Sequence, residues 1–158
     1  MCLQETKLAE IDLQLVRSLW GNSFVDWEML PALRTAGGVL LLWDRQVLEK
    51  LDSVVCQFSV SYLWKTLADS MEWVGTGLYG PTADGLRHGL WDELRSVRQK
   101  WGLSWCVFGD FNVVRFPSER RGCTRLTSNM MDFSDFIEES HLVGLPRGWG
   151  GGGAIHLV

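Results

Sequence analysis

The stretch Trp105-Cys106-Val107-Phe108-Gly109-Asp110-Phe111-Asn112 joins a short apolar run to a glycine and two polar side chains. An apolar run this short that ends at a glycine predicts a buried strand over 105–108. The carboxylate of Asp110 and the amide of Asn112 then follow the strand directly. Polar groups at the strand ends of an α/β protein lie where active sites usually form. This segment therefore predicts a strand of a layered fold and a candidate site at its end.

The rest of the chain alternates helical and extended patterns around this strand. Apolar residues at helical spacing predict helices over 8–20, 86–100 and 128–140, the last with Ser128 as its N-cap. Apolar runs or period-two alternation predict strands over 1–5, 39–43, 54–63 and 72–79. This order mixes hairpin and crossover connections, so we expect an α/β fold with a mixed sheet.

Length and composition favour one folded domain. The chain has 158 residues, of which 46% are hydrophobic and 22% charged, which excludes an intrinsically disordered chain. The longest apolar run, residues 37–43, is far shorter than the roughly 20 residues that span a membrane. The N-terminal residues contain no apolar signal segment, so we expect an intracellular protein with no membrane association.

Charge and cysteine content narrow the function classes further. Fifteen basic against 19 acidic residues give a net charge of −4, which argues against nucleic-acid binding through bulk charge. A short basic stretch, Arg115 to Arg125, is the local exception. The four cysteines form no Cys-x-x-Cys pair, so a structural zinc site is not expected. Cys56 and Cys106 lie in apolar runs and are expected to be reduced core residues.

Two strand-end carboxylates are candidates for metal binding. Glu5 and Asp110 would supply the hard oxygen ligands that Mg²⁺ prefers, and Mg²⁺ suits phosphate-ester chemistry. The alternative, surface carboxylates without a metal, stays open on this pattern alone.

Five short segments occur in a definite order along the chain. They are Cys2-Leu3-Gln4-Glu5-Thr6-Lys7, Ala36-Gly37-Gly38-Val39, Leu78-Tyr79-Gly80-Pro81, Gly109-Asp110-Phe111-Asn112 and Glu119-Arg120-Arg121-Gly122. In this order they resemble the endonuclease/exonuclease/phosphatase superfamily. More narrowly, residues 1–146 resemble the apurinic-type endonuclease domain of plant LINE-type (non-LTR) retrotransposons. The resemblance implies a DNase I-like, four-layer α/β sandwich with mixed sheets, here partial and incomplete.

The resemblance also implies roles for particular residues. Glu5 would bind the catalytic Mg²⁺, for which Mn²⁺ is a possible substitute, and Tyr79 would contact the scissile phosphate. Asp110 would orient or activate the water nucleophile, or protonate the leaving group. Asn112 would hold the phosphate oxygens. DNA is the implied partner, with Arg115, Arg120 and Arg121 as candidate contacts, and no small-molecule cofactor is implied.

The sequence departs from the family pattern at both ends. The first strand with its metal-binding asparagine and the late Ser-Asp-His motif are absent, and His88, His141 and His156 lack the preceding aspartate. Residues 147–158 form a glycine-rich tail, which we interpret as a possible out-of-frame end. Impaired Mg²⁺-dependent DNA cleavage is therefore expected. The alternatives are a non-catalytic retrotransposon remnant, a nucleic-acid-binding fragment and a phosphomonoesterase of the same superfamily.

Overall fold

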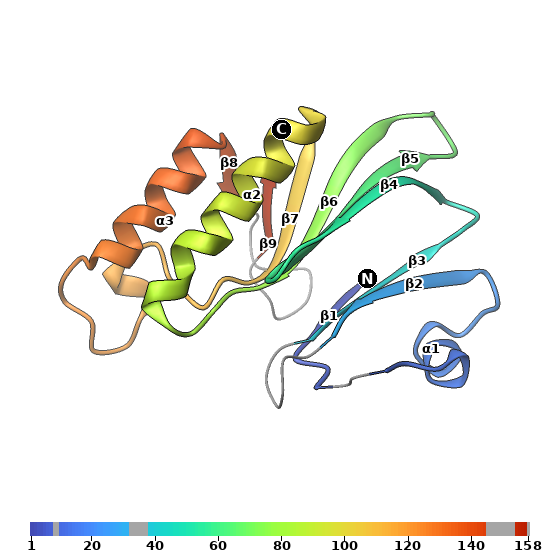
Figure 1. Ribbon diagram of the computed structural model, residues 1–158, viewed down its shortest axis with the longest axis horizontal. Coiled ribbons are helices and arrows are strands. Elements are labelled where there is room, and N and C mark those ends of the chain that lie inside the picture. The colour runs from blue at the N-terminus through green and yellow to red at the C-terminus, as the bar shows by residue number, and fades with distance from the viewer. Residues whose placement is uncertain (8–9, 32–37, 145–153, 158) are drawn as a thin grey trace.

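The computed structural model describes residues 1–7, 10–31, 38–144 and 154–157. Their strands form two sheets (Figure 1). The small sheet has the order β1-β3-β2, with strands β1 (Cys2–Gln4), β2 (Val25–Leu30) and β3 (Val39–Asp44), all antiparallel.

The large sheet has six strands in the order β4-β5-β6-β7-β9-β8. They are β4 (Leu48–Val55), β5 (Ser59–Thr66), β6 (Glu72–Tyr79), β7 (Trp105–Asp110), β8 (Leu142–Gly144) and β9 (Ala154–Leu157). Only β6 and β7 are parallel neighbours, and the other pairs are antiparallel. The expected mixed sheet is therefore confirmed.

Helices cover the outer faces of both sheets (Figure 1). Helix α1 (Leu13–Trp20) lies on the small sheet, and α2 (Arg87–Trp101) and α3 (Ser128–Glu139) lie on the large one. Two short 3₁₀ turns, η1 (Asp84–Leu86) and η2 (Pro117–Glu119), lie in the connections. None of the helices in the described ranges is long and apolar enough to cross a membrane.

Three apolar cores separate four layers. One lies between α1 and the small sheet, one between the two sheets, and one between the large sheet and helices α2 and α3. Strand β3 contributes to two of them, because its alternate side chains point to opposite faces. Leu41 packs toward the large sheet, whereas Leu40 packs toward α1. This two-sided burial explains why residues 39–43 are apolar throughout.

Several sequence-based expectations were wrong. The predicted strand over 54–63 is a hairpin, in which β4 ends at Val55 and β5 begins at Ser59. The turn is held by Glu93 of α2, whose carboxylate accepts hydrogen bonds from the backbone of Gln57 and Phe58. Alternation of apolar residues continues through this turn, so the pattern concealed it.

Other differences concern element ends and burial. The sequence prediction omitted β2, β8 and β9, and the part of β4 before Val54. The N-cap of α3 is Thr127 rather than Ser128, because the Thr127 side chain accepts a hydrogen bond from the Met130 N–H. Cys56 and Cys106 are half-buried rather than core residues. The predicted helix over 8–20 begins at Leu13, where Asp12 caps it.

Candidate active site

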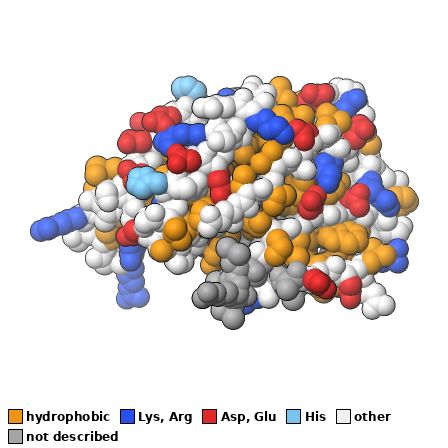
Figure 2. Space-filling view, viewed as in Figure 1, with side chains coloured by type: hydrophobic (Ala, Val, Ile, Leu, Met, Phe, Trp, Pro, Cys, Tyr) orange, Lys and Arg blue, Asp and Glu red, His pale blue; other side chains and the backbone are white. Residues whose placement is uncertain are grey.

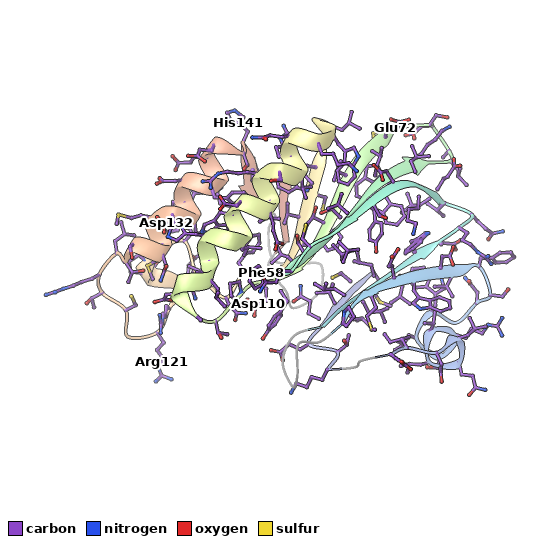
Figure 3. The ribbon with its side chains drawn as sticks, in the orientation of Figure 1. Phe58, Glu72, Asp110, Arg121, Asp132 and His141 are labelled. Atoms are coloured by element: carbon purple, nitrogen blue, oxygen red, sulfur yellow. The ribbon has the colours of Figure 1, made fainter. Side chains whose placement is uncertain are left out.

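The carboxyl ends of β6 and β7 lie side by side at one rim of the large sheet. The strands are parallel, and Tyr79 is the register partner of Asp110. Figure 3 shows Asp110 at this rim, on the side where the two sheets face each other. The end of β1 is held beside β6 by Gln4, whose Nε2 donates a hydrogen bond to the Leu78 carbonyl at 3.2 Å. Three strand ends, from both sheets, therefore meet at one place.

Glu5 and Tyr79 make direct contact across the two sheets. The Tyr79 hydroxyl donates a hydrogen bond to Glu5 Oε1 at 2.6 Å, although the two residues are 74 positions apart. This bond to a carboxylate, followed by partial burial of the phenol, raises the pKa of Tyr79, and the neighbouring Asn112 side chain opposes the shift. Glu5 is exposed and has a φ of 51°, a left-handed conformation that is uncommon for a residue with a side chain.

Asp110 and Asn112 form a tight turn directly after β7. The Asn112 N–H donates to Asp110 Oδ1 at 2.8 Å, and Asn112 Nδ2 donates to the Gly80 carbonyl at 2.6 Å. Asn112 also has a left-handed φ, 52°. The turn thus fixes the amide of Asn112 next to the end of β6 and leaves the Asp110 side chain exposed.

Two glycines allow this close approach of backbones. A Cβ atom at Gly80 would collide with the carbonyl oxygen of Phe111, and one at Gly109 would collide with the carbonyl oxygen of Leu78. The backbone N–H of Gly80 in turn donates to the Asp110 carbonyl at 2.6 Å. The glycines of the Tyr-Gly-Pro and Gly-Asp-Phe-Asn segments are therefore required by packing at the rim.

The predicted arginine contacts do not form a single group. Arg115 is half-buried and forms an ion pair with Glu138 of α3 at 2.8 Å. Arg120 and Arg121 are exposed, and Arg121 projects from the loop that precedes α3 (Figure 3). His88 is exposed in the first turn of α2, and His141 follows the end of α3, away from Asp110 (Figure 3).

Arg87 is a site neighbour that sequence reasoning missed. This residue is buried in the first turn of α2, where its Nη2 donates to the Asn112 carbonyl at 2.8 Å and its Nη1 contacts Asp84 Oδ1 at 2.6 Å. Arg87 thereby supports the turn that carries Asn112. An arginine at the start of a helix usually suggests a solvated side chain, so the sequence offered no signal for this contact.

The donor set at the rim fits a magnesium ion. Mg²⁺ is commonly held by one or two carboxylates, with waters and substrate phosphates completing its coordination. Glu5 supplies an exposed carboxylate, and Asp110 supplies another from the neighbouring strand end. Within the described ranges, no group of three or more His, Cys, Asp or Glu side chains could hold a metal by itself. Any ion here would therefore depend on water and substrate ligands.

Comparison with known proteins identifies the fold. No protein-family model and no curated protein sequence matches the chain. The structure is similar to the endonuclease domain of TRAS1, a telomere-specific non-LTR retrotransposon, with a TM-score of 0.62 and 14% identity over 87% of this chain and 67% of that one.

Two other solved structures have the same arrangement. An endonuclease/exonuclease/phosphatase family protein from Bacteroides thetaiotaomicron gives a TM-score of 0.59 at 10% identity, over 84% of this chain and 52% of that one. The human Nocturnin catalytic domain gives 0.58 at 13% identity, over 90% and 57%. The chain thus spans about half the length of these two structures. It has the DNase I-like fold of the endonuclease/exonuclease/phosphatase superfamily over that part.

Proposed function

We propose that this chain is part of a Mg²⁺-dependent phosphodiester hydrolase that acts on DNA, as in LINE-type endonucleases. The observation that carries the proposal is the meeting of Glu5, Tyr79, Asp110 and Asn112 at one rim of a DNase I-like fold. These four residues come from segments far apart in sequence. Polar residues scattered by chance over a surface would not need the close backbone contacts at Gly80 and Gly109 that bring these side chains together.

The rim contains groups suited to binding and orienting a phosphodiester. Glu5, with Asp110 nearby, would hold Mg²⁺ or Mn²⁺, which supplies charge stabilisation to a phosphoryl oxygen. The Asn112 amide keeps a second N–H beyond its bond to the Gly80 carbonyl, and the Tyr79 hydroxyl becomes a donor once it leaves Glu5, so both are neutral donors for phosphate oxygens. The Asp110 carboxylate is an acceptor that can orient a water molecule or exchange a proton with it. DNA as substrate rests on the sequence resemblance to retrotransposon endonucleases.

A second candidate function is phosphate binding without efficient hydrolysis. It is favoured by the position of His141, which lies away from Asp110 (Figure 3). Loss of a general base typically lowers a rate by about 10²–10⁴-fold. The two candidates differ in turnover rather than in binding.

Nicking of supercoiled plasmid tests the proposal. The wild-type chain, Glu5→Gln and the control Glu49→Gln would be incubated in Mg²⁺ and in EDTA. Glu49 is an exposed carboxylate on the edge strand β4, and its register places it level with the start of β6 rather than with the end at Tyr79. We expect nicking that needs Mg²⁺ and persists in Glu49→Gln. In Glu5→Gln the nicking rate should fall by more than roughly 10–100-fold, which is the usual cost of losing a residue that only supports a metal ligand. Nicking that survives both EDTA and Glu5→Gln would overturn the proposal.

A pair of small substrates separates the superfamily alternatives. Bis(p-nitrophenyl) phosphate reports diester hydrolysis, and p-nitrophenyl phosphate reports monoester hydrolysis. We expect the diester to be preferred. Preference for the monoester would instead support a phosphomonoesterase, a class represented among the similar structures by a Bacteroides thetaiotaomicron mannosyl-6-phosphatase.

A further inference from the structure

The turn between β4 and β5, residues 56–58, lies beside the candidate active site. The Tyr79 N–H donates a hydrogen bond to the Phe58 carbonyl at 3.0 Å, so the turn extends the pairing of β5 with β6 by one residue. Tyr79 is also the register partner of Asp110, and Figure 3 places Phe58 and Asp110 at the same rim. The turn is therefore a direct neighbour of the residue whose hydroxyl contacts Glu5.

Glu93 of α2 fixes the other side of this turn. Its carboxylate accepts hydrogen bonds from the Gln57 N–H at 3.0 Å, from the Phe58 N–H at 3.2 and 3.3 Å, and from the Ser59 hydroxyl at 3.0 Å. Hydrogen bonds to an ionised group are roughly twice as strong as those between neutral groups. Phe58 is thus held at both of its backbone polar groups, its N–H by Glu93 and its carbonyl by Tyr79.

The charge of Glu93 is not balanced by a cation. Acidic and basic side chains lie next to one another on the face of the molecule in Figure 2, and Arg95 pairs with Asp92 and Glu139. Glu93 is half-buried and forms no ion pair with any residue in the described ranges. Burial raises the pKa of Glu93, and the hydrogen bonds from the turn oppose this shift. Because burying an unpaired carboxylate costs free energy, the donors of the turn are the groups that hold this charge in place.

Helix α2 gives Glu93 a firm support. Leu90 and Leu94 of α2 are fully buried in the core between this helix and the large sheet, and the Phe58 side chain belongs to the same core. A Cβ atom at Gly89 would lie 3.5 Å from the Phe58 ring, so the ring packs against the helix. The backbone and the side chain of Phe58 are therefore both tied to α2.

We infer that Glu93 is a positioning residue for Tyr79, because through Phe58 it fixes the end of β6 from which the Tyr79 hydroxyl reaches Glu5. This inference rests on the proposed function, since it gives Glu93 a part in that site without contact to the substrate. Strand β6 ends at Tyr79, where β7 holds it on one side and Phe58 holds it on the other. Without Glu93, the side away from β7 loses its anchor to the helix.

The pKa of Tyr79 in Glu93→Gln tests the inference without any substrate. Glutamine keeps the shape of the side chain, but it loses the charge and places an NH₂ group among the donors of the turn. The matched control is Asp52→Asn. Asp52 of β4 also connects this hairpin to α2, but it accepts hydrogen bonds from Lys100 and Trp101 at the last turn of the helix.

We expect the pKa of Tyr79 to fall toward its ordinary value of about 10 in Glu93→Gln and to stay at the wild-type value in Asp52→Asn. The carboxylates that raise this pKa are Glu5 and Asp110, so a fall in Glu93→Gln reports a change of geometry. Amide hydrogen exchange at the Tyr79 N–H should also become faster in Glu93→Gln only. An unchanged pKa of Tyr79 in folded Glu93→Gln, or an equal fall in the control, would overturn the inference. If Glu93→Gln does not fold, Glu93→Asp, which keeps the charge on a shorter side chain, is measured with the same expected and contrary outcomes.

Failure of the inference differs from failure of the proposed function. The kcat for bis(p-nitrophenyl) phosphate should fall by up to about 100-fold in Glu93→Gln, the cost of misplacing a group by about 1 Å, and be retained in Asp52→Asn. Diester hydrolysis by the wild-type chain, with an unchanged pKa of Tyr79 in Glu93→Gln, would remove the role of Glu93 and keep the hydrolase. A lowered pKa of Tyr79 in Glu93→Gln, with no hydrolysis of any substrate by the wild-type chain, would keep the link from Glu93 to Tyr79 and remove the hydrolase.

Discussion

The pKa of the Tyr79 hydroxyl depends on the charge of Glu5. A neutral phenol donates a hydrogen bond to the carboxylate, whereas a phenolate oxygen would face a second negative charge at the same distance. Both effects favour the protonated phenol, so the Glu5 carboxylate is the main cause of the raised pKa of Tyr79. Removing the charge of Glu5 should therefore reverse the shift.

Glu5→Gln is expected to lower the pKa of Tyr79 toward its ordinary value of about 10. The measurement is a pH titration by NMR with ¹³C-labelled tyrosine, which is simple because the chain has two tyrosines. The other, Tyr62, is fully buried, and burial raises its pKa further. Glu49→Gln serves as the control and should leave the titration unchanged. An unchanged or higher pKa in Glu5→Gln would show that the two side chains do not meet in solution.

Arg87 supports the site without reaching its surface. It is buried, and it supplies the Asn112 carbonyl with a charged donor. Arg87→Met should destabilise the chain by roughly 1–3 kcal/mol, because the carbonyl loses its partner. Urea unfolding measures this, with Arg17→Met on the exposed face of α1 as the control, expected within about 0.5 kcal/mol of wild type. Equal stability of the two variants would contradict the contact.

The β6–β7 pair shows how a strand end becomes a site. Gly80 lets the end of β6 approach the backbone of Phe111. Gly80→Ala forces these backbones apart and should cost about 1–3 kcal/mol, the usual range for overpacking. Gly85 in η1 has open space around it, so Gly85→Ala should be nearly neutral. Thermal unfolding of the two variants provides the comparison, and similar midpoints would argue against the close approach.

Elements with strong local patterns were predicted correctly, and those fixed by distant contacts were not. The strand over 72–79 has the predicted limits, and the apolar run at 39–43 is a buried strand. The turn at Gln57 and Phe58 depends on Glu93, which is 35 residues from Phe58. Strand β2 carries Asp26 and Glu28 among its apolar residues and is only half-buried, so its pattern was weak.

The same distinction holds for what could be predicted of the candidate site. Glu5, Tyr79, Asp110 and Asn112 were named from the sequence through their resemblance to known segments, and their roles stay predictions. The Glu5–Tyr79 hydrogen bond and the support from Arg87 were not foreseen. Both depend on residues that are far apart in the chain, so only the packed fold brings them together. The glycine-rich residues 145–153 lie outside the described part of the chain, so the interpretation of the tail stays a prediction.

The candidate site spans the interface between the two sheets. Glu5 follows a strand of the small sheet, whereas Tyr79 and Asp110 end strands of the large one. The sheets meet through an apolar core that includes Leu41, which would touch a Cβ placed at Gly77 of β6. The geometry of the site is therefore a property of the whole sandwich. A change in the core between the sheets should disturb the site from a distance.

Leu40 and Leu41 allow this to be tested on one strand. Both are almost fully buried in β3, but Leu41 faces the large sheet and Leu40 faces α1. Leu→Ala at either position should cost about 2–5 kcal/mol. Only Leu41→Ala loosens the sheet-to-sheet packing that holds Glu5 against Tyr79, so only this variant should lower the pKa of Tyr79. The pKa is measured by NMR under conditions where both variants stay folded. Equal pKa values of Tyr79 in the two variants would mean that the site is held by its local hydrogen bonds rather than by the packing of the sheets.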